Sequence, residues 1–421
     1  MSNKIIKLSR NTESAPICDN STQSVAFSHY NNISAQLPIN PDTNEIVSKN
    51  IREQAKQCLL NIQTIVESID HDMSDVVKVN VFLSDIAHSK AVNEVYSTFF
   101  NDHLPARTAV SVAQLPIEGA LVQMDALISN GVGTTPQKPC DLVKLSRNTP
   151  KAPKSAISNQ TVAFSHYNNI SAQLPIEPST GKMIIGDVKK QTTQCLTNIK
   201  MILESINVPL DDIVKVTVYL KDLSDMEAVN EVYSTFFPDS AIARTLGYVP
   251  ARTFVSASEL PLNALVQIDA VISHGDGTPP QAVEDRHGIV IKPNNTPDAP
   301  MDSLSTQTVA FSHYNHISAQ LPLDVKTNEI IDGDVKEQAK QCLTHIKTIV
   351  ESIGHVMDDL VKVNIQVTDV ADMNAINEVY KTFFSRELPA RTVVGVSEIA
   401  KGAQVQIDAV VSNAEGTPPQ R

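Results

Sequence analysis

The sequence has no tryptophan, few aromatic side chains (5%) and no excess of positive charge. Its 34 lysines and arginines are outnumbered by 47 aspartates and glutamates, which gives a net charge of −13. Proteins that bind nucleic acid usually present a basic stripe with interleaved aromatic side chains. The composition therefore argues against a nucleic-acid partner, and with it against a ribonuclease activity.

Long apolar runs and cysteine motifs are also missing. No segment approaches the roughly 18 apolar residues of a membrane-spanning helix, and residues 1–16 lack the apolar core of a signal peptide. The five cysteines form no CxxC motif and no Cys/His spacing typical of a zinc site. We therefore expect a cytoplasmic protein with no membrane partner, no metal and no disulfide framework.

The chain does contain enough apolar residues for several cores. Hydrophobic residues make up 42% of the 421 positions and charged residues 19%, which is typical of a globular protein. At about 150 residues per domain, the length predicts three domains.

An internal repeat supports that number. The segment VAFSHYNNISAQLP at residues 25–38 returns at 162–175 and, with one Asn replaced by His316, at 309–322. Each copy ends in a linker-like Gly/Thr/Pro segment. These segments place the domains at 1–138, 139–283 and 284–421, with an eight-residue loop insertion near 238–249 in domain 2.

Hydrophobic periodicity predicts the elements of one unit. Alternating apolar residues indicate strands, and an apolar stripe with a period near 3.6 residues indicates a helix. In domain 1 the expected elements are a hairpin at 25–28 and 30–36, a helix at 51–69, a half-buried strand at 77–81, a short helix at 92–99, strands at 107–112 and 121–128, and a further strand at 5–8. The order β-β-α-β-α-β-β predicts an α+β domain with helices on one face of a mixed sheet.

Five segments, present in the same order in each copy, carry a resemblance to a known family. In domain 1 they are SAQLP (34–38), VESI (66–69), VKVNV (77–81), VNEVYSTFF (92–100) and PART (105–108). The set resembles the RidA/YjgF family of small imine and enamine deaminases. This resemblance implies a chorismate-mutase-like fold, homotrimers with ligand clefts between subunits, and no metal or organic cofactor. Three copies in one chain then imply a monomeric chain that forms an intramolecular pseudo-trimer.

The resemblance also implies binding residues for small 2-oxo and 2-imino carboxylates. The family arginine, whose planar fork pairs with a carboxylate, is matched by Arg107, Arg252 and Arg391. In domain 2 the inserted loop offers Arg244 as a competitor, and spacing to the next strand favours Arg252. The other matched positions are Ser34, Ser171 and Ser318, and, at the start of the second helix, Asn93, Asn230 and Asn377. The alternatives are a surface ion pair for the arginine, a hydroxyl satisfied within the sheet for the serine, and a helix cap for the asparagine.

The sequence departs from the family at several site positions. The family glutamate on the last strand is replaced by Gln123, Gln267 and Gln406, and the cysteine after the arginine by Ala109, Phe254 and Val393. A family aromatic residue is replaced by Ser21, Ser158 and Ser305, and a glycine by Ala35, Ala172 and Ala319. Glutamine can orient a water molecule but cannot accept its proton, and a positioned general base contributes about 10²–10⁴ in rate. We assign the three glutamines as the catalytic candidates and expect slow or inactive clefts.

Two further sets of repeated residues invite functional interpretations. The histidines at 29, 166 and 313 fall in a hairpin turn without a second ligand nearby, which favours a structural role. The cysteines at 58, 195 and 342 lie on the apolar helix stripe, which favours buried thiols over reactive ones. The paired amides at 31–32 and 168–169, with His316 in the third copy, have no firm explanation, although a ring would place them at its axis.

Two functions follow. The first is the hydrolysis of reactive 2-imino or enamino acids to 2-oxoacids and ammonia in inter-domain clefts, weakened by the missing glutamate. The second is a non-catalytic sensor or scaffold that binds small carboxylates.

Overall fold

The computed structural model describes residues 5–131, 133–135, 144–238, 248–274, 278, 291–414 and 416–417. The expected domain boundaries near 138 and 283 lie outside these residues, as does nearly all of the expected insertion in domain 2. No helix among the described residues is both long and apolar enough to cross a membrane.

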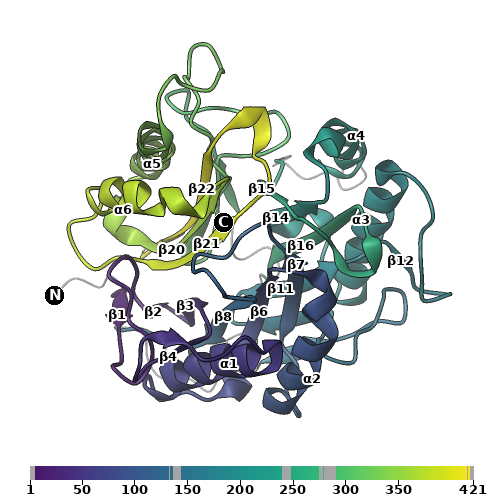
Figure 1. Cartoon of the computed structure of the whole chain (residues 1–421). Coiled ribbons are helices and arrows are strands. Elements are labelled where there is room, and N and C mark those ends of the chain that lie inside the picture. Colours follow the sequence, from purple (N-terminus) through teal and green to yellow (C-terminus); the bar gives the residue numbers. More distant parts are fainter. Residues whose placement is uncertain are drawn as a thin grey trace.

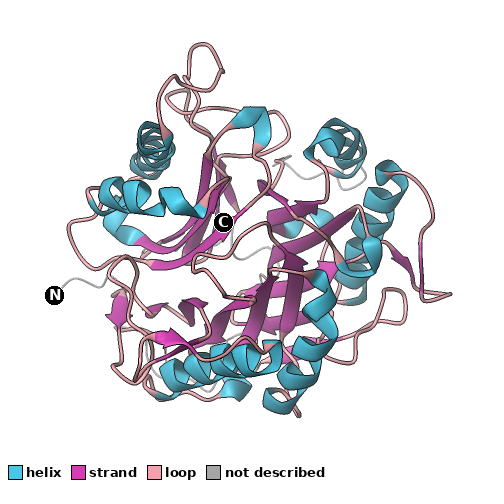
Figure 2. Cartoon of the chain, viewed as in Figure 1, coloured by secondary structure: helices cyan, strands magenta, loops and turns pink. Residues whose placement is uncertain are grey.

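Three copies of one set of elements follow each other along the chain (Figures 1 and 2). Domain 1 has β1 (Leu8–Arg10), β2 (Ser24–Phe27), β3 (Tyr30–Gln36), β4 (Ile39–Asn40), β5 (Glu45–Ile46), α1 (Ile51–Glu67), β6 (Val76–Leu83), α2 (Ser89–Phe99), β7 (Ala106–Ser111) and β8 (Val122–Ser129). Domain 2 has β9 (Leu145–Arg147), β10 (Thr161–Phe164), β11 (Tyr167–Gln173), β12 (Ile176–Glu177), β13 (Lys182–Met183), α3 (Val188–Ser205), β14 (Ile213–Leu220), α4 (Met226–Phe236), β15 (Ala251–Ser256) and β16 (Val266–Ser273). Domain 3 has β17 (Lys292–Asn294), β18 (Thr308–Phe311), β19 (Tyr314–Ile317), α5 (Val335–Ser352), β20 (Leu360–Val367), α6 (Met373–Lys381), β21 (Ala390–Gly395) and β22 (Val405–Ser412).

Each domain contains one mixed six-stranded sheet. In domain 1 the strand order is β1-β2-β3-β8-β6-β7, and the other two domains repeat it. Strands β6 and β7 are parallel, and α2 makes the crossover that parallel neighbours require. The predicted α+β class and element order are confirmed. An additional first strand is present as well, but it lies at Leu8–Arg10 and not at the predicted residues 5–8.

The long helix covers one face of each sheet because its apolar stripe is continuous. In α1, Cys58, Leu59 and Ile62 are buried against the sheet, and the side chain of Asn50 caps the first turn. The thiol of Cys58 lies against the carbonyl of Val122 in this core. Burial raises the pKa of this thiol, so the prediction of a buried, unreactive cysteine is confirmed.

The opposite face of each sheet is buried as well, which differs from the predicted half-buried strand. Lys78 is only 8% exposed and, with Asn80 and Phe82, faces the other domains rather than water. Alternation of polar and apolar residues shows that one face of a strand is polar, but it does not show that this face meets water. Here the polar face is covered by the neighbouring domains.

The three domains form a ring closed by equivalent contacts. The Tyr30 hydroxyl donates to the carbonyl of Phe164 in domain 2, the Tyr167 hydroxyl to Phe311 in domain 3, and the Tyr314 hydroxyl to Phe27 in domain 1. The three tyrosine rings also meet one another edge to face, with centroids about 6 Å apart. In Figure 1 the helices lie on the outside and the sheets face inward.

The repeated histidines occupy the hairpin turns, as predicted. His29 contacts the carbonyl of Asn130 through Nδ1, and no group of residues in the described part of the chain has the makeup of a metal site. Burial lowers the pKa of both His29 and His166 to about 4, so both are neutral at pH 7.

Candidate functional site

The candidate arginines occupy identical places at the start of an edge strand. Arg107 pairs with Val79 across β6 and β7, and the equivalent strands pair Val216 with Arg252 and Val363 with Arg391. This register supports Arg252 as the counterpart in domain 2. Arg252 and Arg391 are 6% and 8% exposed. The alternative of an ion pair is found in domain 2, where Arg252 pairs with the half-exposed Asp302 at 3.2 Å.

Each arginine is oriented by the asparagine of its own domain. The Asn93 Oδ1 accepts a hydrogen bond of 2.8 Å from Arg107 Nη2, and Asn230 and Asn377 accept equivalent bonds from Arg252 and Arg391. The second helix begins at Ser89, so Asn93 lies inside it and is not its cap. The expected position at the helix start was therefore wrong, and the side chain orients the guanidinium instead.

A tyrosine that the sequence reading assigned to the apolar stripe completes this cluster. The Arg107 guanidinium carbon lies 4.8 Å from the centre of the Tyr96 ring, and Arg252 and Arg391 stack in the same way on Tyr233 and Tyr380. The Tyr96 hydroxyl is buried without a hydrogen-bond partner among the described residues. A signal was present in the sequence, because Asn93 and Tyr96 are three residues apart and share a helix face.

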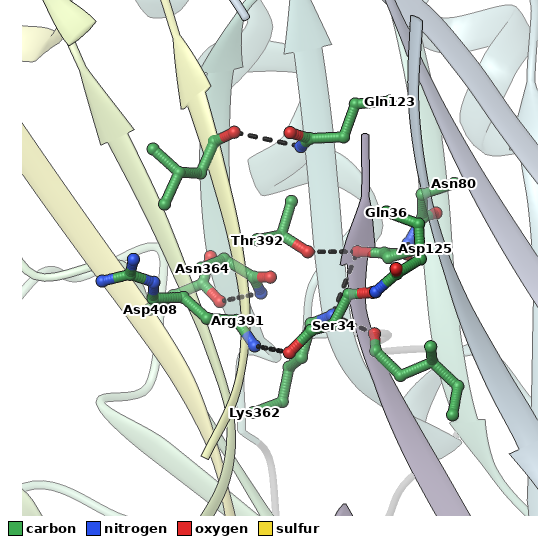
Figure 3. A network of polar contacts seen from close by, with 12 residues as sticks. Ser34, Gln36, Asn80, Gln123, Asp125, Lys362, Asn364, Arg391, Thr392 and Asp408 are labelled. Carbon is green, nitrogen blue, oxygen red and sulfur yellow. Dashed lines mark hydrogen bonds and ion pairs between the residues drawn. The ribbon is translucent and has the colours of Figure 1, made fainter. Parts of the chain in front are cut away.

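The candidate serines join neighbouring domains. Ser34 in domain 1 donates its hydroxyl proton to the carbonyl of Thr22 and accepts a 2.8 Å bond from the backbone N–H of Arg391 in domain 3 (Figure 3). Ser171 and Ser318 make the same bonds to the N–H groups of Arg107 and Arg252. Because each hydroxyl has one proton, which a carbonyl already accepts, these serines position the arginine strand.

The candidate glutamines also reach across to the neighbouring domain. The Gln123 Nε2 donates to the carbonyl of Val393, two residues after Arg391 (Figure 3), and Gln406 Nε2 donates to the carbonyl of Phe254. The equivalent Gln267 has a buried Oε1 without a partner among the described residues. An ionised glutamate could not donate these bonds, so the contacts to the neighbouring domain explain why glutamine stands at positions 123 and 406.

These contacts define three junctions, each built from two domains. The first junction combines Arg107 and Asn93 of domain 1 with Ser171 of domain 2. The second combines Arg252 and Asn230 of domain 2 with Ser318 and Gln406 of domain 3. The third combines Arg391 and Asn377 of domain 3 with Ser34 and Gln123 of domain 1.

The first junction opens into a hollow beside Asn93. Its volume is about 700 Å³, and residues of both domains line it, including Lys90 and Ile157. Arg107 Nε is buried and has no hydrogen-bond partner among the described residues, and burial lowers the pKa of this guanidinium by desolvating its charge. The arrangement suits an anionic group small enough to pair with a planar fork.

A polar layer crosses the axis of the ring. Lys78 pairs with Asp269 of domain 2 at 2.8 Å, and Lys362 of domain 3 pairs with Asp125 of domain 1 at 3.1 Å. The third ammonium group, on Lys215, instead donates to Thr253 and to the carbonyl of Ile317. Sequence reasoning missed this layer, because each pair joins different copies of the repeat.

The unexplained amides also face the axis. Asn32, Asn169 and His316 line a cavity of about 190 Å³ beneath the three central tyrosines. The Nδ2 atoms of Asn32 and Asn169 are buried without a partner among the described residues. The expectation that a ring would place these side chains at its axis is confirmed for this member of each pair.

The fold and these junctions define a protein of three tandem chorismate-mutase-like domains with an arginine-centred site between each pair. A family model described as Endoribonuclease L-PSP matches the chain three times, at residues 13–129, 149–273 and 296–413. Because the matches cover most of the chain, the protein belongs to this family, which includes the RutC, RidA and YjgF proteins.

Individual relatives match one third of the chain at a time. A RutC family protein of Pyrococcus abyssi is 42% identical over 124 residues, which are 29% of this chain and 91% of the relative. A 2-iminobutanoate/2-iminopropanoate deaminase of Dermatophagoides farinae is 41% identical over 106 residues, or 25% of this chain and 83% of the relative. The crystal structure of the E. coli YjgF gene product is 33% identical and covers 31% of this chain and 98% of that one, with a TM-score of 0.28.

Proposed function

We propose that this protein hydrolyses reactive 2-imino or enamino carboxylic acids to 2-oxoacids and ammonia at its inter-domain junctions. The observation that carries the proposal is the half-buried Arg107, which stacks on Tyr96 and is oriented by Asn93, a residue that also lines an open hollow. The deaminase of Dermatophagoides farinae, 41% identical to part of this chain, supports the reaction class.

The substrate carboxylate pairs with the free edge of the arginine. A bidentate pair fixes both the position and the plane of the carboxylate, which sets the adjacent imine carbon in one place. Ser171 supports this geometry indirectly by holding the N–H of Arg107.

Hydrolysis then needs one water molecule and no redox partner. An enamine first tautomerises to the imine. The water oxygen then adds to the imine carbon while one water proton passes to the nitrogen, which gives a carbinolamine. Its hydroxyl proton passes to the nitrogen as the C–N bond breaks and the C=O bond forms, which releases ammonia and the 2-oxoacid. By equivalence with Gln123 and Gln406, Gln267 of domain 2 belongs to the first junction. Its Oε1, which has no partner among the described residues, is the acceptor we assign to orient the water. Without a carboxylate base the acceleration rests on orientation and electrostatics.

A non-catalytic carboxylate binder is the second candidate. The amides of Gln123 and Gln406 favour it, because both already donate to backbone carbonyls of the adjacent domain. Junctions fixed in this way bind a carboxylate without activating water. The protein would then act as a sensor or scaffold.

A coupled assay separates the two candidates. An amino-acid dehydratase generates the imine in situ, and ammonia release is timed with and without the protein. We expect faster release with the parent chain and a loss of this gain when Arg107, Arg252 and Arg391 are all changed to Ala. Binding of a 2-oxoacid without any gain in rate would establish the binder instead.

A further inference from the structure

The three junctions differ at one position of the loop that brings Asp302 to Arg252. A loop before the second strand of each domain is held in one conformation by a glutamine, Gln23, Gln160 or Gln307, whose amide donates to three backbone carbonyls. The second residue after the last of these carbonyls is Cys18, Ser155 or Asp302. The same loop therefore presents a thiol, a hydroxyl or a carboxylate.

In the second junction that carboxylate contacts the arginine directly. Asp302 Oδ2 lies 3.2 Å from Arg252 Nη2, across the boundary between domains 2 and 3. The carboxylate is held in place locally, because Oδ1 accepts from the Leu304 N–H and Oδ2 from the Ser305 hydroxyl. Asp302 thus takes the place that a substrate carboxylate would occupy.

The surroundings of Arg252 are filled as well. The Phe254 ring lies 4.7 Å from the guanidinium carbon, at the same distance as the Tyr233 ring. The equivalent of Phe254 is Ala109 in the first junction and Val393 in the third. A small cavity of about 10 Å³ lies beside Phe254 and Gln406.

The first junction has the opposite character. Ser155 is neutral, and the hollow beside Asn93 measures about 700 Å³ and is lined by Lys90 and Glu94. The position equivalent to Lys90 in domain 2 is Glu227, so the second helix of domain 2 has a negative charge where that of domain 1 has a positive one. In the third junction, Arg391 has no carboxylate partner among the described residues.

We propose that Asp302 occupies the carboxylate site of Arg252, so that only the first and third junctions bind 2-oxo and 2-imino carboxylates. This inference rests on the proposed function of the arginines. A carboxylate built into the chain acts at a high effective concentration, so a free ligand must displace it to enter the second junction. Asp302 therefore sets which junctions are used.

Calorimetric titration with 2-oxobutanoate tests the inference by counting sites on the full chain. We expect two sites per chain in the parent. Asp302→Ser should bind three, because it gives the second junction the residue of the first, and Ser155→Asp should bind one, because it gives the first junction the residue of the second. Asp298→Ser removes an exposed carboxylate from the same loop as Asp302 and is the control, with two sites. Circular dichroism checks that each variant is folded.

The outcomes separate the inference from the proposed function. Three sites in the parent, or two in Asp302→Ser, overturn the role of Asp302 while leaving carboxylate binding intact. Two sites in Ser155→Asp would also contradict it. No binding by the parent or by Asp302→Ser overturns the proposed function and this inference with it.

Discussion

At the scale of single residues, the sites differ most in what surrounds their glutamines. Gln406 donates to the Phe254 carbonyl and to Gln366 Oε1, at 2.7 and 2.6 Å. A carboxylate there would face two oxygen atoms. Gln267 leaves its own oxygen without a partner among the described residues, so its position accepts a carboxylate more easily.

Gln267→Glu should therefore raise the turnover of imine hydrolysis, by up to the 10²–10⁴ that a positioned base contributes. The gain should appear in kcat rather than KM, because Arg107 binds the carboxylate in both variants. The coupled ammonia assay measures it, and Gln406→Glu is the matched control, with no gain. Equal gains in the two variants would contradict the assignment of the second junction, which contains Gln406, as closed to substrate.

A half-buried histidine in the cavity at the axis makes the free energy of unfolding depend on pH. Burial lowers the pKa of His316 to about 3, whereas the unfolded chain titrates near 6.5. Below about pH 6.5 the unfolded state takes up a proton that the folded state refuses, so the free energy of unfolding falls as the pH falls from about 6.5 to about 3. Asn occupies the equivalent positions in domains 1 and 2.

His316→Asn should reduce this acid sensitivity. Urea unfolding at pH 7.5 and pH 5 should show a loss of stability smaller by about 1–2 kcal/mol than in the parent. His71 should have the opposite effect, because its hydrogen bond with Asp75 raises its pKa in the folded state. His71→Asn should therefore increase the loss of stability between pH 7.5 and pH 5. Unchanged losses in His316→Asn would show that its ring is not neutral and buried in solution.

The sequence predicted some site residues and not others for a physical reason. The arginines and the asparagines recur in all three copies, each within its own repeated sequence motif, so comparing the copies was enough to find them. Asp302 was not found because it differs between copies, and only the folded loop shows that it faces Arg252. Tyr96 was assigned to the apolar stripe of its helix. An aromatic residue fits both a buried core position and a position stacked on a guanidinium, so the sequence alone does not separate the two roles.

At the scale of elements, strands of different domains are joined by single side chains. Ser34 on β3 supports β21 through the Arg391 N–H and is 4% exposed. The hairpins, helices and sheet were predictable because their hydrophobic periods are local. The burial of the polar face of β6 was not predictable, because the same alternation is expected for a face that meets water and for a face that meets another polar surface.

Ser34→Ala should lower the free energy of unfolding by about 2 kcal/mol, because a buried N–H and a buried carbonyl both lose their partner. Urea unfolding measures the change. Ser68→Ala is the control, since the Ser68 hydroxyl only bonds back to Ile65 in its own helix and is partly exposed. Similar losses in the two variants would show that the bond between domains adds nothing.

At the scale of the whole molecule, one chain supplies all three partners of the ring. We expect a particle of one chain in solution, with the 45.8 kDa mass of the polypeptide. Intramolecular closure is favoured because the linked domains are present at high effective concentration. Light scattering checks this, and a mass three times larger would mean that domains pair between chains.

The ring also constrains how the protein is made. The bond from Tyr314 to Phe27 joins residues 287 positions apart, whereas the other two closing bonds span about half that distance. On the ribosome, domain 1 emerges long before the partner of its Phe27 carbonyl is translated. Until then the axis-facing apolar residues of the first two domains lack their third neighbour. Protection of the nascent chain from aggregation therefore comes only with release of the last domain, which makes prematurely truncated chains a natural target for chaperones and proteases.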